Sequence, residues 1–130
     1  IMRGNHIQIV LQPFEETINV VVAKNIKKAI KYANKYHKHT PKLEYEESDN
    51  VDGMHYKTPD NYRFIFLRYD ADVHTVVHEC FHAVMKTATD RGNKFSHKGE
   101  EFYAYSLGQL TENVMDFFYG IEEVRKHNTR

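Results

Sequence analysis

Hydrophobic and polar positions along the chain recur with two different periods, and these periods predict its elements. Runs rich in β-branched and aromatic residues predict strands at 7–11, 17–22, 43–46, 54–57 and 62–69. The 17–22 run either forms a strand or leads directly into the next helix. Apolar residues at helical spacing predict helices at 24–39, 72–88 and 100–119, and residues 121–130 either add a helical turn or two or fray. The order of elements predicts an α+β fold in a single domain over residues 1–130.

The segment 72–88 is the best-defined helix. Asp70 or Asp72 can serve as its N-cap, and Gly92 is a natural stop after its last turn. Residues at helical spacing predict one apolar flank, formed by Val73, Val77, Phe81, Val84 and Ala88.

This helix contains an H-E-x-x-H string, His78-Glu79-Cys80-Phe81-His82. Positions i and i+4 lie on one helix face about one turn apart, so both imidazoles can reach one metal ion. Glu79 follows the first histidine, and its carboxylate can therefore lie beside that ion and accept a proton from a bound water. Residue types and spacing together predict a zinc site on this helix.

A catalytic zinc site takes three protein ligands, so one more His, Glu or Asp is expected. Glu101 is the preferred candidate, because Ala104 and Gly108 on the same helix face would permit close approach to the histidine helix. Glu100, His74 and His97 remain as alternatives. His74 is disfavoured as a ligand, since side chains from three consecutive turns of a straight helix can rarely all reach one ion.

The motif and the downstream helix resemble the gluzincin type of zinc metallopeptidase. His78-Glu79-x-x-His82 is followed by Glu101-x-x-Ala104 nineteen positions after the second histidine. The same segments look like the small metallopeptidase-like proteins of tailed bacteriophages, over roughly residues 62–112. Met85 and Ala88 stand where a metzincin would have Gly and a third His, so that branch is excluded.

The resemblance implies a compact zincin-like domain, with a small twisted sheet, an active-site helix and a second, ligand-bearing helix packed against it. It implies Zn²⁺ as cofactor, with His78, His82 and Glu101 as ligands and Glu79 as general base. The expected activity is hydrolysis of a peptide or amide bond in a peptide or protein substrate. The alternative is a non-catalytic metal-binding domain that serves as an interaction or host-takeover module.

An oxyanion donor is also expected in such a hydrolase. Tyr103, Tyr105, His97 and His55 are the candidates, and Tyr105 is the working assignment although the sequence does not choose among them. Zincins place a strand along the rim of the cleft, where a peptide can pair with its free edge. The 62–69 strand either fills that role or lies inside the sheet.

Composition narrows the partners. Lys and Arg balance Asp and Glu at 18 each, so nucleic acid is not expected as a partner. The lysines of the 24–39 helix are read as a solvated surface. The single cysteine fits a reducing compartment. Because the sequence shows no membrane span and no signal-peptide core, the expected location is the cytoplasm. If the protein is phage-encoded, this is the cytoplasm of the host cell. A domain of this size has few residues with which to build a deep cleft. We therefore expect that the substrate binds shallowly, or that a second copy of the chain or another protein completes the site.

Overall fold

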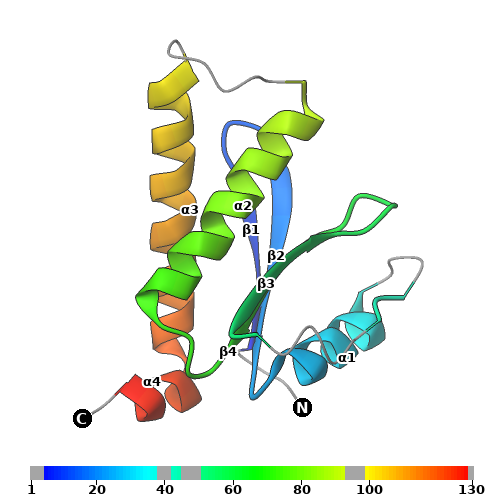
Figure 1. The fold of residues 1–130 in the computed structure, drawn as a ribbon, viewed down its shortest axis with the longest axis vertical. Helices are drawn as coiled ribbons and strands as arrows, with labels where there is room; N and C mark the ends of the chain where they lie inside the picture. The colour runs from blue at the N-terminus through cyan, green and yellow to red at the C-terminus, as the bar shows by residue number, and fades with distance from the viewer. Residues whose placement is uncertain (1–4, 38–41, 45–50, 93–98, 129–130) are drawn as a thin grey trace.

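A four-stranded mixed sheet lies at the centre of the fold, with helices on both of its faces (Figure 1). The computed structural model describes residues 5–37, 42–44, 51–92 and 99–128. The elements are β1 (His6–Leu11), β2 (Glu16–Ala23), α1 (Ile26–Tyr36), β3 (Gly53–Lys57), β4 (Arg63–Arg68), α2 (Val73–Asp90), α3 (Glu100–Gly120) and α4 (Glu122–Asn128). The predicted α+β class is confirmed, as are strands within the 7–11, 17–22, 54–57 and 62–69 segments.

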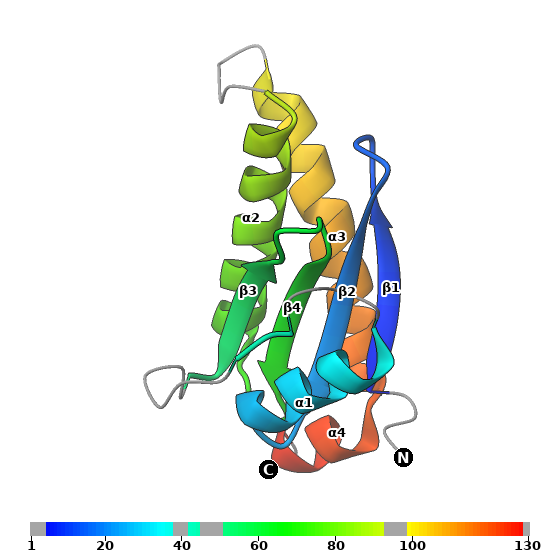
Figure 2. The same ribbon diagram turned by 90° about the vertical axis from the view of Figure 1, so that its right-hand side faces the viewer.

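The strand order β1-β2-β4-β3 decides which edge strand borders α2, the helix that carries the H-E-x-x-H string. β1 is antiparallel to β2, β2 is parallel to β4, and β3 is antiparallel to β4. Figure 2 shows β1 and β3 at opposite edges of the sheet, with α1 on one face and α2 and α3 on the other. Of the two roles left open for the 62–69 strand, the structure therefore shows the interior one. β3 occupies the edge instead.

Each face of the sheet buries its own apolar cluster. One cluster joins β1, β2 and β4 to α2, α3 and α4, and its fully buried members include Ile65, Leu110 and Phe118. The other lies between α1 and strands β2 and β4, and it joins Phe64 and Phe66 of β4 to the apolar face of α1. Alternate residues of β4 thus serve the two clusters, as the period of a strand requires.

Side-chain hydrogen bonds cap the start of α1 and join the helix to the segment that follows it. The side chain of Asn25 accepts from the Lys28 amide and caps the start of α1. The Asn34 side chain donates to the Leu43 carbonyl and accepts from the Leu43 amide, both at 2.8 Å. The backbone groups of Leu43 are therefore paired with a side chain rather than with a neighbouring strand. The predicted 43–46 strand is accordingly absent at Leu43 and Glu44, and the rest of it, like residues 38–39 of the predicted helix, lies outside the described residues.

Helix α2 begins and ends as predicted, but only part of its predicted apolar flank is buried. The Asp72 side chain accepts from the Thr75 amide at 2.8 Å, and Gly92 follows the last turn with φ +77°. Val73, Val77 and Phe81 of the predicted apolar flank are exposed. Val84 and Ala88 of that flank are buried as predicted, and the other buried residues of α2 form a neighbouring stripe that packs against the sheet and α3: Val76, Glu79, Cys80, Ala83 and Thr87.

Candidate metal centre

The two motif histidines lie side by side on the exposed face of α2. Their Nε2 atoms are 3.0 Å apart, and the two ring centroids are 4.5 Å apart. Two nitrogens bound to one tetrahedral zinc ion at 2.0–2.1 Å would be separated by roughly 3.3 Å. A hydrogen bond between neutral rings also accounts for 3.0 Å. The pair therefore fits a shared metal ion closely, with a small outward adjustment.

Glu79 lies beside the histidines but on the flank of α2 that faces the sheet edge. Its side chain is buried, with the residue only 7% exposed. The backbone N–H of His55, in β3, donates a hydrogen bond to the Glu79 carboxylate. Burial raises the pKa of Glu79 above its usual value, while His78, His82 and the His55 N–H partly oppose that rise. A carboxylate with a raised pKa is suited to accept and release a proton near neutral pH.

The first residue of β3 allows this close packing of strand against helix. A Cβ on Gly53 would lie 2.7 Å from Thr75 Cγ2 and 3.0 Å from Glu79 Cγ. Any other residue would therefore push β3 away from α2 at the position where Glu79 lies. Gly53, His55 and Lys57 alternate along β3 toward α2, and they follow the helix from its first turn to its last.

The third ligand is not defined by the described residues, since no three His, Cys, Asp or Glu side chains among them gather as a metal site. Glu101 is exposed on α3, and a Cβ on Gly108 would meet no atom within 4 Å, so the predicted close approach at Gly108 is wrong. Glu100 instead faces α2, where it lines a pocket with Phe81 and Met85.

The remaining candidates take different places. His74 is exposed, and its ring is stacked 6.2 Å from that of His78, beside the pair but on the same helix. His97 lies outside the described residues. Cys80 is buried in the core, and burial raises the pKa of its thiol to about 12. It belongs to the packing of α2 rather than to the metal site.

The expected oxyanion donors are also separated by the fold. Tyr105 is 64% exposed and lines none of the pockets found beside α2, whereas Tyr103 is buried and faces α2. His55 is next to Glu79 and close enough to His82 for the two rings to interact electrostatically. Of these candidates, His55 is the one that the fold of the described residues places beside Glu79 and His82.

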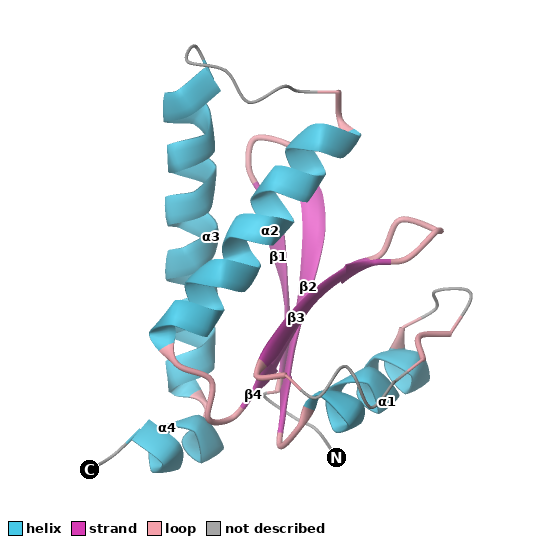
Figure 3. Cartoon of the chain, in the orientation of Figure 1, coloured by secondary structure: helices cyan, strands magenta, loops and turns pink. Residues whose placement is uncertain are grey.

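Two pockets flank the histidine face of α2. The first, of about 180 Å³, lies between α2 and α3 and is almost wholly apolar apart from Glu100. The second, of about 410 Å³, lies between the end of β3 and α2, and Lys57 and Lys86 are among its lining residues. Figure 3 shows the arrangement of the elements, with α2 crossing between α3 and the β3 edge. The motif thus has an apolar pocket on one side and a cationic one on the other.

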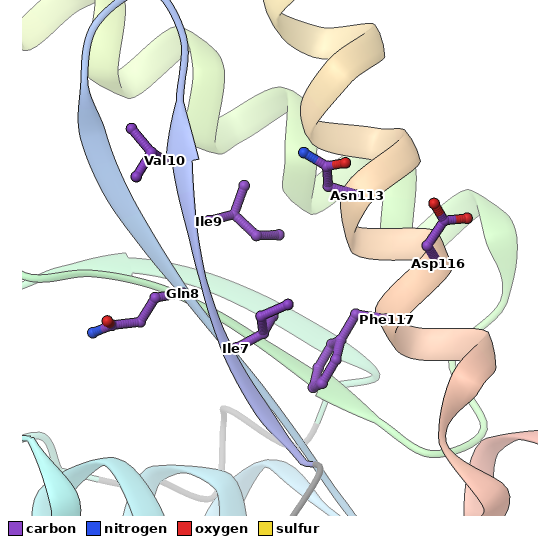
Figure 4. A pocket seen from close by; sticks show the side chains of 7 residues that line it. All are labelled: Ile7, Gln8, Ile9, Val10, Asn113, Asp116 and Phe117. Atoms are coloured by element: carbon purple, nitrogen blue, oxygen red, sulfur yellow. The ribbon is translucent and has the colours of Figure 1, made fainter.

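A larger pocket, of about 540 Å³, lies at the opposite edge of the sheet, between β1 and α3 (Figure 4). Its lining is mostly apolar, with the polar side chains of Gln8, Asn113 and Asp116. It contains no histidine and is separated from β3 by the width of the sheet. Its size therefore gives no reason to place the chemistry there.

Sequence reasoning missed the contribution of β3 to this site. Gly53 was visible only as part of an Asp-Gly turn signal, and the backbone N–H of His55 leaves no trace in sequence. Both act through strand β3 lying against α2, which depends on the order of strands in the sheet.

Comparison with protein-family models, with curated proteins and with solved structures finds no match to this chain. None of the helices in the described residues is long and apolar enough to cross a membrane.

Proposed function

We propose that the protein is a zinc-dependent hydrolase of peptide or amide bonds, a zincin-like enzyme in which Glu79 is the general base. The observation that carries the proposal is the convergence of three groups on α2. The His78 and His82 nitrogens lie 3.0 Å apart at the surface, and the buried carboxylate of Glu79 lies on the adjacent flank.

His78 and His82 would hold the ion, with a carboxylate from the first turn of α3 as the third ligand. Zinc, when bound, supplies a water of lowered pKa and polarises the scissile carbonyl. Glu79 would take the proton of that water and return it to the leaving nitrogen. The His55 N–H holds the carboxylate in place, and burial keeps its proton affinity high enough for both transfers.

The free edge of β3 supports a peptide as substrate. Within the described part of the chain β3 pairs only with β4, so its other edge can bind an extended chain by backbone hydrogen bonds. That edge borders Glu79, because a Cβ on Gly53 would lie 3.0 Å from Glu79 Cγ and the His55 backbone N–H stabilises the Glu79 carboxylate. A peptide paired with β3 would therefore pass close to the general base.

The test is the Glu79→Gln variant of the zinc-loaded protein, assayed against a mixed peptide library. We expect zinc stoichiometry to be unchanged and turnover to fall by at least about 10²-fold. Glu112→Gln, an exposed change on α3, is the matched control and should retain full activity. Equal turnover in the Glu79 and Glu112 variants would remove Glu79 from the mechanism.

The third ligand is tested by Glu100→Gln and Glu101→Gln in parallel. The one that supplies the ligand should weaken zinc binding by roughly 10- to 100-fold, and the other should not. Glu101 is the ligand implied by the family resemblance, whereas Glu100 is the one that faces α2. If neither substitution changes zinc affinity, a third ligand from the first turn of α3 is ruled out.

A second candidate is a non-catalytic metal-binding module. It is favoured by the exposure of both histidines and by the lack of a third ligand among the described residues, since a partner could complete such a site. Wild-type protein that binds zinc but cleaves nothing in the library would support this candidate.

A further inference from the structure

The pocket at the end of β3 lies one helical turn beyond the histidine pair. Its lining comes from β3, the turn after it and α2: His55, Tyr56, Lys57, Thr58, Pro59 and Lys86. Lys86 follows His82 by four residues, so it lies about 6 Å further along the same side of α2. An extended peptide advances about 3.3 Å per residue, so a chain at the metal would place a side chain one or two residues away in this pocket.

Positive charge exceeds negative charge around this pocket. The Asp90 carboxylate contacts three cations, with Lys57 Nζ at 3.2 Å, Arg63 Nη2 at 3.0 Å and Lys86 Nζ at 3.3 Å. Glu16 lies 3.8 Å from Arg63 and is already paired with Arg91 at 2.9 Å. Asp60 also lies beside the pocket, where its carboxylate accepts a hydrogen bond from Thr58 Oγ1. Four cations thus share three carboxylates, which leaves an excess of one positive charge.

The excess charge is both fixed in place and accessible. Arg63 is 1% exposed, so its charge is held in low-dielectric surroundings where screening by salt is weak. Lys57 and Lys86 are 28% and 51% exposed, so their ammonium groups can bind a ligand while they remain near Asp90. The field of Arg63 and Lys86 also reaches His55, where it adds to burial in lowering the pKa of the ring. The His55 Nε2 atom is buried without a hydrogen-bond partner in the part of the chain that the structure describes.

We propose that this pocket binds a carboxylate of the substrate, one or two residues from the scissile bond, through Lys57 and Lys86. The inference rests on the proposed peptidase function and gives it a substrate class, peptides with acidic groups beside the cleaved bond. The same chemistry has two sources, an Asp or Glu side chain and a free C-terminal carboxylate. The first would make the enzyme an endopeptidase with acidic preference, and the second would make it a carboxypeptidase.

The experiment compares matched peptides on the zinc-loaded protein. One set carries Glu, Gln or Lys at each of two positions on either side of the cleaved bond, and the other is neutral with a free or an amidated C-terminus. We expect a roughly five- to tenfold higher kcat/KM for the peptide with the correctly placed carboxylate. Lys86→Gln and Lys57→Gln should each remove most of this preference, and Lys86→Glu should favour the Lys peptide. Lys31→Gln, on the far face of the sheet in α1, is the control and should keep it.

Binding separates failure of this inference from failure of the proposed function. Fluorescence anisotropy of the labelled peptides on zinc-loaded Glu79→Gln protein needs no turnover, so it reports on the pocket even if the protein is not a hydrolase. Tighter binding of the acidic peptide that is lost in the Glu79→Gln/Lys86→Gln protein supports the subsite. Equal binding and equal cleavage of the Glu, Gln and Lys peptides, with free and amidated C-termini also alike, would overturn it.

Discussion

Gly53, the first residue of β3, offers a direct test of how closely the edge strand packs on α2. An alanine there would bring its Cβ to 2.7 Å from Thr75 Cγ2, 3.0 Å from Glu79 Cγ and 3.3 Å from Leu67 Cδ2. Carbon atoms pack best at 3.5–4.0 Å, so the contact with Thr75 is about 1 Å too short. Leu67 is fully buried and cannot move aside easily, so either β3 or the first turns of α2 must shift.

Overpacking of this kind lowers the free energy of unfolding by about 1–3 kcal/mol. Alanine also has less conformational freedom than glycine in the unfolded chain, which raises the free energy of unfolding by about 0.4–1 kcal/mol. We therefore expect Gly53→Ala to lower the free energy of unfolding by about 1–2 kcal/mol, measured by urea denaturation. Gly108→Ala, in the middle of α3 where a Cβ meets nothing within 4 Å, is the matched control and should stabilise by about 0.5–1 kcal/mol.

A compensating change isolates the contact. Thr75→Ser removes Cγ2 but keeps the hydroxyl, so the double variant Gly53→Ala/Thr75→Ser should recover part of the lost stability relative to the sum of the single changes. A Gly53→Ala protein as stable as wild type, or a double variant with strictly additive effects, would refute the packing of β3 against α2 described above.

Three further predictions concern stability. Burial lowers the pKa of His55 to about 4, and the charges of His82, Arg63 and Lys86 contribute to this shift. Between pH 6.5, the usual pKa of histidine, and pH 4, the unfolded chain therefore binds a proton at His55 that the folded chain does not bind. This difference should lower the free energy of unfolding by about 3 kcal/mol from pH 7 to pH 4. In metal-free His55→Gln protein the midpoint of urea unfolding should change less over the same pH range than in metal-free wild type. Asp90→Asn should cost about 2–3 kcal/mol in urea unfolding, because the buried Arg63 guanidinium loses its closest counter-charge; a change below 0.5 kcal/mol would contradict this. Asn34→Ala should cost about 1–2 kcal/mol of thermal stability, since it leaves the Leu43 amide and carbonyl unpaired, and an unchanged Tm would show that water replaces both bonds.

Features that depend on neighbouring residues were the most predictable from sequence. Asp72 and Gly92 bound α2 through hydrogen bonds and backbone angles within a few residues, and the i, i+4 spacing alone brings His78 and His82 together. The buried face of α2 was less predictable, because two apolar stripes run along it. The sheet lies against the stripe with smaller side chains, such as Cys80 and Ala83, since these permit closer approach.

Features that depend on distant pairing were not predictable. Strand β4 became interior because β2 and β3 pair on its two sides, and nothing in its own alternation expresses that. The preference for Glu101 depended on both Ala104 and Gly108 approaching α2; Ala104 lines the pocket beside α2, but a Cβ on Gly108 would meet no atom within 4 Å. A helix pattern gives the faces of a helix but not which face meets its neighbour, so Glu100 and Glu101 could not be separated by sequence.

The central claim is that the His78 and His82 pair holds a catalytic zinc ion beside Glu79. It is tested most directly by crystals of the zinc-loaded protein measured on both sides of the zinc absorption edge. We predict one anomalous peak bonded to the Nε2 atoms of both histidines and to a carboxylate at the start of α3, with a position open to solvent next to Glu79. Zinc bound elsewhere, or a fourth protein side chain in the open position, would contradict the claim.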